Sequence, residues 1–573
     1  MKWKLRNEGL EKKVDSKMDQ PFSLHPIVER ILSSRGIDEG EIENFLNPDY
    51  ERDVLDPFLF PDMESVVKRI KRAKDDSEKI LIFGDYDADG VTSTVVMKEM
   101  LTDFGIETSI YIPDKGKEGY GMSKEVVKKT GEHGFSLIIT VDCGISNFDE
   151  IEYANELGID VIVTDHHCVP EKIPNAFAIV NPKMKNSNYP YDNLAGVGVA
   201  FKVAQAVYEK LMPEKKEQVK WLLDLVAIGT VADCVSLVGE NRTLVKYGLI
   251  VLSKTKRIGL QELFRIGRIR IDESNVPDAQ MISFQVAPRI NAASRMSHAK
   301  LAYKLISEKD RAQARLDALE IEEQNKSRQK ATEYVVREIK KMIDAEDEQK
   351  KVVFVADENF PVGIIGLVAG RIASQYNKPT VVINKDEKES KGSLRSIPQL
   401  DIVSVLEECS EFLEKFGGHA QAAGISVKNE NLDKLKDKMN EVVEKKLDGK
   451  DLTSVIWIDD EVSVNDLSFG LVDNLNKLRP FGIGNPEPAF LIKRLIIQEL
   501  KWVGNGEKHL KLFLRSSDNS PKIFEAIGFS MNDKFGNLKE GDLIDMVFGI
   551  QKDEWNGNQK LQLRIVDLKK REE

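Results

Sequence analysis

The sequence is poor in cysteine, lacks long apolar runs and begins without a leader-like segment. Its 4 cysteines are isolated from one another, and no CxxC pair suggests a zinc knuckle or a redox motif. No apolar run approaches the roughly 18 residues that span a membrane. The first residues, MKWKLRNEGLEKKVDSK, contain no apolar core of the kind that signal peptides carry. These absences predict a cytoplasmic protein without structural disulfides.

The charge of the chain is unevenly distributed. The 573 residues carry a formal net charge of −12, which at first sight argues against nucleic acid as a partner. Between Arg242 and Arg270, however, eight residues are basic and only Glu262 is acidic. This stretch could supply phosphate contacts, or it could be a solvated helical face, and both interpretations remain open. Bound cations would also offset part of the acidic charge.

Hydrophobic patterns divide the chain into regions. From about 78 to 180, apolar runs alternate with helical patterns, which predicts βαβ units and a parallel sheet with helices on both faces. The runs are Lys79–Phe83, Thr108–Ile112, Ser136–Val141, Val161–Thr164 and Phe177–Val180. A charged stretch from Ser307 to Glu348 has neither Gly nor Pro and predicts a long linker helix. A second α/β region follows to about 447, and short strands after Ser454 suit a small antiparallel barrel.

Acidic and imidazole side chains gather after the predicted strands. They are Asp85, Asp87 and Asp89 after the first strand, Asp142 at the end of the third, Asp165, His166 and His167 after the fourth, and Asp233 farther along. Open parallel sheets bind ligands beyond the carboxyl ends of their strands. Neighbouring carboxylates repel one another unless a cation binds them, and carboxylates with imidazoles suit Mn²⁺. The pattern predicts two metal ions about 3.5–4 Å apart that hydrolyse a phosphoester; the alternative is a solvated acidic turn with structural histidines.

Motifs along the chain resemble a known superfamily. The sequences DYDADG at 85–90, TVDCG at 140–144, DHH at 165–167 and GTVAD at 229–233 resemble, in that order, the DHH phosphoesterases. GGHAQAAG at 417–424 is similar to the motif of the DHH-associated domain, DHHA1. Other motifs, spread over nearly the whole chain, narrow the resemblance to the RecJ family. They are FLNP at 45–48, DPFL at 56–59, EGYG at 118–121, APRINAA at 287–293, KGSLRS at 391–396 and PFGIGNP at 480–486.

The resemblance implies an α/β architecture. We expect a parallel-sheet DHH domain, a long linker helix, a second α/β domain of the DHHA1 type and a C-terminal OB-like β-barrel. The expected segments are an N-terminal helical and loop region at 1–75, the DHH catalytic domain at 76–300, the linker helix at 301–349, the DHHA1 domain at 350–452 and the OB-fold domain at 453–573.

The resemblance also implies an activity. We expect an exonuclease specific for single-stranded DNA that hydrolyses phosphodiester bonds 5′→3′ by a two-metal mechanism, with two Mn²⁺ or Mg²⁺ ions per site. It would release 5′ mononucleotides and act in DNA repair and recombination, as a monomer with a single-strand-binding protein and a helicase as partners. One alternative is a phosphodiesterase for nanoRNA or cyclic dinucleotides, whose members lack a strand-tracking barrel. Another is a non-catalytic DNA-binding scaffold, which the intact ligand set disfavours.

The resemblance assigns roles to the residues at the strand ends. The implied metal ligands are Asp85 and Asp142 for one ion and Asp87, Asp142, His166 and Asp233 for the other. Asp142, His166 and His167 are implied to be catalytic, with His167 facing the scissile phosphate. Asp89 and Asp165 would contact the ligand residues and not the metal ions themselves, and Asp165 would orient an imidazole.

A second implied group binds the substrate. Its members are Lys115, Tyr120, Arg289, Asn291, Ser393, Arg395 and His419. Ser393 and Arg395 would cap the 5′ end, because a planar guanidinium suits a terminal phosphate. Lys115 stands where the family usually carries arginine, so recognition of the 5′ end would be looser there. Arg289, Asn291 and His419 would line the path of the strand.

Overall fold

The computed structural model describes residues 1–6, 24–114, 121–345, 350–504, 506–517, 522–555 and 558–571. The chain divides into two compact units, one of Val54–Thr453 and the other of Met1–Asp53 with Ser454–Glu573. The predicted N-terminal region at 1–75 is therefore shared between the two units. Among the described residues, no helix has an apolar stretch long enough to cross a membrane.

The larger unit begins with a parallel sheet in the order β3-β2-β4-β5-β6. Its strands are β2 (Lys79–Gly84), β3 (Thr108–Tyr111), β4 (Phe135–Val141), β5 (Asp160–Thr164) and β6 (Ala178–Val180). Leu81 and Phe83 pack with side chains of α6 (Lys124–Glu132) and α7 (Phe148–Glu156) on one face. Alternate residues point to the other face, where α5 (Ala88–Asp103) and α8 (Gly196–Leu211) contact the sheet. Both faces are thus covered by helices, which explains the continuous apolar runs.

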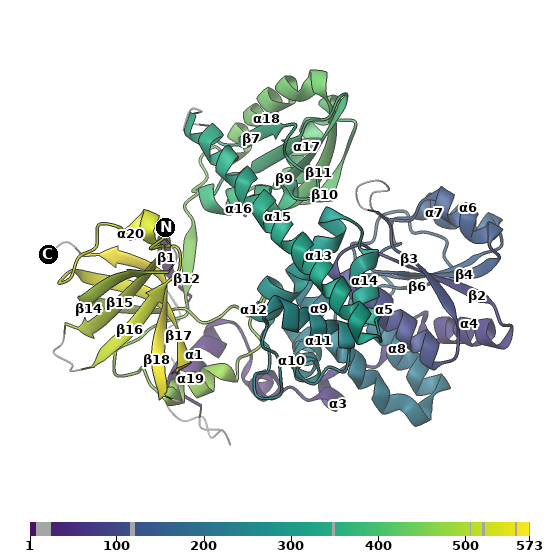
Figure 1. Ribbon diagram of the computed structural model, residues 1–573, viewed down its shortest axis with the longest axis horizontal. Coiled ribbons are helices and arrows are strands. Elements are labelled where there is room, and N and C mark those ends of the chain that lie inside the picture. Colours follow the sequence, from purple (N-terminus) through teal and green to yellow (C-terminus); the bar gives the residue numbers. More distant parts are fainter. Residues whose placement is uncertain are drawn as a thin grey trace. The chain divides into compact units, whose positions relative to one another are not determined.

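Helices surround the sheet and continue beyond it. They include α4 (Met63–Asp75), α9 (Leu223–Ala232), α10 (Gly239–Ser253), α11 (Ile258–Gly267), α12 (Ala279–Met281), α13 (Ala287–Met296) and α14 (Lys300–Ser307), with a π-helical turn at Ile282–Val286. The long helix α15 (Arg311–Ala345) packs against α11 and α13 near its start and against α16 (Ile365–Tyr376) and β7 (Val353–Asp357) near its end. Figure 1 shows α15 running from the first α/β domain to the second.

The second α/β domain of the larger unit has a mixed sheet in the order β10-β11-β9-β8-β7. Its remaining elements are β8 (Thr380–Asn384), β9 (Glu389–Arg395), α17 (Ile402–Glu408), β10 (Lys415–His419), β11 (Ala422–Lys428) and α18 (Leu432–Leu447). Only the pairing of β7 with β8 is parallel among the described strands of this sheet. The core residues Val381 and Ile383 pack with residues of α17 and α18.

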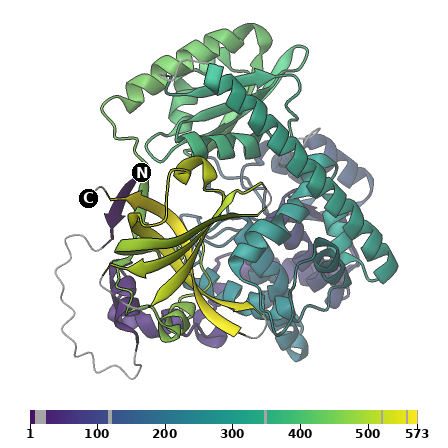
Figure 2. The same ribbon diagram turned by 60° about the vertical axis from the view of Figure 1, so that its left-hand side comes forward.

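The smaller unit is built on a closed barrel in the order β14-β15-β16-β18-β17, which the pairing of β14 with β17 completes. Its strands are β14 (Phe490–Val503), β15 (His509–Ser516), β16 (Ile523–Gly528), β17 (Leu543–Trp555) and β18 (Asn558–Lys570), and Figure 2 shows them curving around one another. Shorter elements are α1 (Pro26–Ser34), α2 (Ile42–Leu46), α3 (Tyr50–Asp53), β13 (Asp460–Glu461), α19 (Phe469–Asn476) and α20 (Asn532–Phe535). Side chains of α1, α2 and α19 share the barrel core.

One strand of the smaller unit was not predicted. β1 (Lys2–Leu5) pairs in parallel with β12 (Val455–Ile458), so its partner lies far along the chain, just before the barrel strands. The parallel-sheet domain, the long helix, the second α/β domain and the closed barrel confirm the predicted fold class.

Candidate metal centre

Acidic side chains converge beyond one edge of the parallel sheet. β2, β4 and β5 end at Gly84, Val141 and Thr164, so Asp85, Asp142 and Asp165 each directly follow a strand. Within the described residues, three groups of side chains bring one ligand atom each to within 4.8 Å of one another. The groups are Asp85, Asp87 and Asp142; Asp142, His166 and His167; and Asp89, His166 and Asp233. Because the groups share Asp142 and His166, they form one cluster.

His166 lies at the centre of this cluster. Its Nε2 is 3.1 Å from Asp142 Oδ1, 3.6 Å from Asp233 Oδ2 and 3.9 Å from Asp89 Oδ2. Burial lowers the pKa of His166 to about 3. The ring is therefore neutral at physiological pH and can offer a nitrogen lone pair to a metal ion.

Burial and mutual repulsion disfavour the ionised forms of the carboxylates in this cluster. Burial raises the pKa of Asp142 well above its usual range, and the charge of Asp89 adds to the effect. Burial and the charge of Asp87 raise the pKa of Asp233 to about 7. Bound divalent cations would remove this repulsion and favour the ionised carboxylates. Carboxylate oxygens with one neutral imidazole form a donor set that fits Mn²⁺ or Mg²⁺.

Asp89, a member of the cluster, and Asp165, which precedes the histidine pair, are buried and also bind protein atoms. Asp89 accepts hydrogen bonds from the backbone N–H groups of Gly196 at 2.7 Å and Val197 at 2.9 Å, at the start of α8. Asp165 Oδ1 lies 2.7 Å from Nδ1 of His167, and Asp165 Oδ2 accepts from Ile145 N at 3.0 Å. Burial lowers the pKa of His167, but the hydrogen bond and charge of Asp165 outweigh it, so the pKa is raised overall.

The backbone at Asp142 is strained. Its φ is 60°, in the left-handed region that residues other than glycine rarely adopt. A Cβ atom on Gly196 would lie 2.4 Å from Asp142 Oδ1, so only glycine allows α8 to start this close. Strain of this kind, at about 1–3 kcal/mol, persists where the surroundings impose it and is frequent at functional sites.

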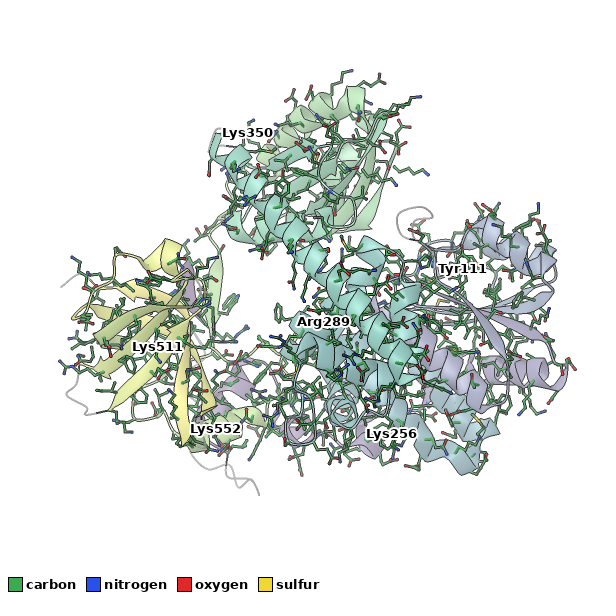
Figure 3. The ribbon with its side chains drawn as sticks, viewed as in Figure 1. Tyr111, Lys256, Arg289, Lys350, Lys511 and Lys552 are labelled. Carbon is green, nitrogen blue, oxygen red and sulfur yellow. The ribbon has the colours of Figure 1, made fainter. Side chains whose placement is uncertain are left out.

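Asn291 lies beside the cluster, whereas Arg289 contacts other helices. Asn291 Oδ1 accepts a hydrogen bond from Ala88 N at 2.8 Å and so supports the loop that carries Asp87. Arg289, labelled in Figure 3, donates to Glu322 Oε2 at 2.8 Å. It also donates to the carbonyl oxygen of Gln285 at 2.6 Å. Glu322 balances the charge of Arg289, and this ion pair connects α13 to α15.

The remaining predicted substrate residues belong to two other places. Ser393 and Arg395 are neighbours on β9, where Arg395 Nη1 donates to Ser393 Oγ at 3.2 Å. His419 is exposed on β10. Lys115 and Tyr120 lie outside the described residues.

Two residues that follow β6 were missed by the sequence analysis. Asn181 Nδ2 donates to the carbonyl oxygen of His167 at 3.0 Å, and Lys183 Nζ donates to that of His166 at 2.6 Å. Both side chains hold the backbone of the histidine pair. Their signal was present in the sequence, because Asn181 directly follows the apolar run that predicted the fifth strand.

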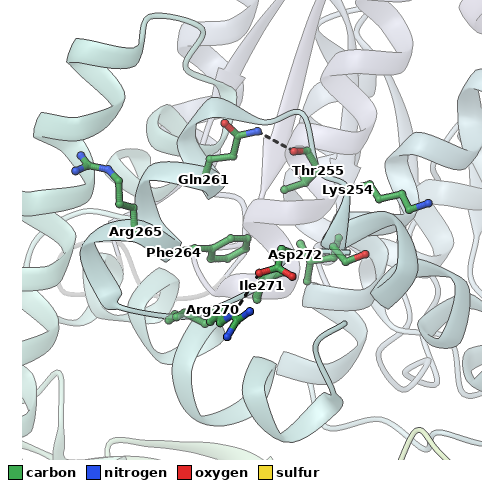
Figure 4. Close-up of a pocket in the computed structure, with 11 residues that line it drawn as sticks. Lys254, Thr255, Gln261, Phe264, Arg265, Arg270, Ile271 and Asp272 are labelled. Carbon is green, nitrogen blue, oxygen red and sulfur yellow. Dashed lines mark hydrogen bonds and ion pairs between the residues drawn. The ribbon is translucent and has the colours of Figure 1, made fainter. Parts of the chain in front are cut away.

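The basic residues of 242–270 do not share one surface. Arg242 is 2% exposed, and burial lowers its pKa to about 9. Arg257 lies between Asp224, whose Oδ2 is 3.0 Å from its Nε, and Glu99. Other residues of the stretch line a cavity of about 440 Å³, in which Arg270 lies beside Asp272 (Figure 4). Burial and ion pairing thus remove Arg242 and Arg257 from the residues that could contact a phosphate.

Comparisons with known proteins follow the same domain order. Residues 79–230 match the DHH family, N-terminal domain; residues 348–445 match the DHHA1 domain; and residues 458–567 match the RecJ OB domain. The chain is 37% identical over 569 residues to the single-stranded-DNA-specific exonuclease RecJ of Bacillus subtilis, covering 99% of this chain and 70% of that protein. It is 32% identical to the exonuclease of the same name from Haemophilus influenzae, covering 95% of this chain and 96% of that protein.

A solved structure agrees with these matches. The crystal structure of RecJ in complex with Mn²⁺ from Thermus thermophilus is similar with a TM-score of 0.81 and 28% identity, covering 96% of this chain and 76% of that one. The sequence identity over nearly the full length, the order of the domains and the acidic cluster at the sheet edge all agree. The chain belongs to the RecJ family of DHH phosphoesterases.

Proposed function

We propose that this protein is a metal-dependent exonuclease that hydrolyses single-stranded DNA from its 5′ end and releases 5′ mononucleotides. The observation that carries the proposal is the cluster of overlapping carboxylate and imidazole ligand groups at the edge of the sheet. The family relationship supports the substrate, because the relatives are named as exonucleases specific for single-stranded DNA. A role in DNA repair and recombination follows from the same relationship.

The overlapping ligand groups are consistent with two ions that share Asp142. As the family resemblance implies, Asp85 and Asp142 would hold one ion, and Asp87, Asp142, His166 and Asp233 would hold the other. Two divalent ions held in this way would supply electrostatic stabilisation of the attacking and leaving oxygens of a phosphodiester. The buried carboxylates would favour binding of such ions, because the ions would relieve their mutual repulsion.

His167 is suited to a direct contact with the substrate. Its side chain is 34% exposed, and its Nδ1 is engaged by Asp165. The raised pKa of His167 increases its protonated fraction, so Nε2 can donate a hydrogen bond to a phosphate oxygen. Asp165 acts through His167 by fixing the orientation of the ring.

The barrel of the smaller unit supports binding of a flexible strand. Phe513 on β15 is half-buried, with Lys501 Nζ and Lys511 Nζ at 5.9 Å and 5.4 Å from its ring centre. Lys511 is labelled in Figure 3. Aromatic faces beside cations bind single strands by stacking and phosphate contacts. Trp502 packs against the barrel core. A single-strand-binding protein and a helicase as partners, a monomeric state and action in the cytoplasm are further parts of the proposal.

The proposal is tested with end-labelled oligonucleotides of single-stranded DNA, double-stranded DNA and RNA in Mn²⁺. Immediate release of a labelled mononucleotide from 5′-labelled single-stranded DNA is the expected result, with the 3′-labelled strand shortening gradually. Asp142→Asn is the control for contaminating nucleases. Release of the 3′ label first would contradict the polarity, and faster hydrolysis of dinucleotides than of long strands would favour a small-substrate phosphodiesterase.

A further inference from the structure

The ribbon formed by β1 and β12 in the smaller unit has an apolar face and a basic face (Figure 1). On its inner face, Trp3 and Leu5 pack with side chains of the barrel strands β14 and β17. Successive side chains of a strand point to opposite faces. Lys2 and Lys4 of β1 therefore share the outer face with Trp457 of β12, and all three are exposed.

Two cations approach the indole ring of Trp457 on this outer face. Lys4 is the partner of Trp457 in the strand register, and its Nζ lies 5.9 Å from the centre of the ring. The guanidinium carbon of Arg6 lies 5.6 Å from the same centre. Trp457 nevertheless remains 48% exposed. The ring therefore offers a flat apolar surface to a ligand, with positive charge beside it.

The positive charge of the outer face is only partly balanced. Arg6 Nε lies 3.5 Å from Asp459 Oδ1. The same oxygen accepts hydrogen bonds from Nε and Nη2 of Arg35 at 3.1 Å and 3.0 Å, so one carboxylate serves two arginines. The segments 1–6 and 454–458 contain no acidic residue. The outer face therefore carries more positive than negative charge and favours an anionic partner.

We propose that the outer face of this ribbon binds single-stranded nucleic acid, with Trp457 stacking on a base and Lys4 and Arg6 contacting phosphates. Alternate residues of a strand are about 6.6 Å apart, which is comparable with the distance between successive phosphates of an extended strand. Bases of any sequence can stack on an aromatic ring. An acidic peptide would use the cations but would leave the flat ring without a matching plane. Single-stranded nucleic acid therefore fits both features.

The inference rests on the proposed function, because the bound strand is taken to be the substrate. It adds a contact outside the closed barrel, since neither β1 nor β12 is one of the barrel strands. A strand held there would stay attached at a second point while its end is cleaved, which would favour repeated cleavage of long strands over short ones.

The test is equilibrium binding by the full chain in EDTA, which prevents cleavage, with any affinity tag at the C-terminus. The probes are fluorescently labelled strands of about 30 nucleotides, longer than the roughly 4–16 that one OB fold occupies. One strand carries bases, and the other is abasic throughout with the same phosphates. The variants are Trp457→Ala, Trp457→Phe and Lys4→Gln. The matched control is Trp221→Ala in the larger unit, whose ring is 44% exposed and has Lys256 Nζ 4.2 Å from its centre.

We expect Trp457→Ala to weaken binding of the strand with bases about tenfold, as loss of one stacked base does. Its binding of the abasic strand should be nearly unchanged. Trp457→Phe, which keeps an aromatic ring, should keep most of the affinity. Lys4→Gln should weaken binding of both strands and reduce the slope of log K against log salt by about 0.7, as loss of one phosphate contact does. Trp221→Ala should bind both strands as wild type does.

Two results with the DNA probes would overturn the proposal. One is a Trp457→Ala protein that binds the strand with bases as tightly as wild type does. The other is an equal loss of affinity for both strands in that variant, which would indicate a changed fold and not lost stacking.

Two further measurements separate this proposal from its alternatives. A labelled oligoglutamate peptide that binds wild type but not Trp457→Ala, with strand binding unchanged, would assign the ribbon to an acidic protein segment and overturn the proposal. Failure of the proposed function has a different signature. The ribbon variants would then bind strands as expected, while wild type would release no nucleotide from 5′-labelled single-stranded DNA in Mn²⁺.

Discussion

Replacing Asp142 with asparagine should lower nuclease activity but raise the stability of the metal-free fold. Asp142 is 3% exposed, and burial followed by the charges of neighbouring carboxylates raises its pKa well above the usual range. Asparagine has nearly the same shape without the charge, and it tolerates the left-handed backbone at this position, where φ is 60°. Asp142→Asn therefore removes repulsion without adding a cavity or new backbone strain.

The direction of the effect follows from Asp142 itself, because burial and the charge of Asp89 disfavour its ionised form. The neighbouring Asp233 gives the order of magnitude, since burial and the charge of Asp87 raise its pKa to about 7, which corresponds to roughly 4 kcal/mol against the ionised form. For Asp142→Asn we expect the free energy of unfolding of the metal-free protein at pH 8 to rise by about 2–4 kcal/mol. A carboxyl group with a raised pKa favours folding only while it is protonated. Wild type therefore loses stability as the pH rises through the raised pKa of this carboxyl group, and the advantage of the variant grows over that range.

The assay is thermal unfolding of wild type and variant in EDTA and in Mn²⁺, between pH 5 and pH 8. In EDTA the variant should unfold at a higher temperature, by about 1 °C for each kcal/mol in a unit of this size. In Mn²⁺ the order should reverse, because the ion binds the folded wild type more tightly. Nuclease activity of the variant should fall more than about a hundredfold.

A control and a refuting result complete this prediction. Asp75→Asn changes an exposed carboxylate on α4 that pairs with Lys71, and it should alter neither the metal response nor the activity. If Asp142→Asn is less stable than wild type in EDTA at pH 8, the reasoning is wrong. The carboxylate would then stabilise the fold without a cation.

Other substitutions test the supports of the site and of the fold. Asp165→Asn should lower the pKa of His167 and shift the limb of the pH–rate profile that His167 controls toward lower pH; an unchanged profile would contradict the pairing. Asn291→Ala should weaken Mn²⁺ binding about tenfold in calorimetry, because the start of α5 loses its acceptor; equal affinity would exclude this role. Lys202→Met should lower the free energy of unfolding by about 3–5 kcal/mol in urea, since buried Glu240 loses its cation, and adding Glu240→Gln should restore part of it.

The outline of the metal centre could be predicted because it depends on local patterns. Apolar runs located the parallel strands, and the carboxyl ends of such strands meet at one edge of the sheet. Asp85, Asp142 and Asp165 follow three of these strands directly, so their proximity followed from the strand assignment. The same reasoning would have reached Asn181 after β6, but an amide is a weaker signal than a carboxylate.

Contacts between residues that are distant in the sequence could not be predicted in this way. Arg289 and Arg295 lie in the same helix, but only the packed structure pairs one with Glu322 and brings the other to Gly363. Likewise, nothing in the local sequence of β1 indicates a partner at Val455.

The sequence by itself determined the strand order along the chain, the ligand types and the edge where they gather, because alternation and spacing are local properties of the backbone. Only the tertiary structure decided which charges are buried, paired or left facing the site. Burial turned Arg242 into a core residue, and contact with Glu322 balanced Arg289. Charge balance depends on neighbours that are distant in sequence, and these are set only when the helices and sheets pack together.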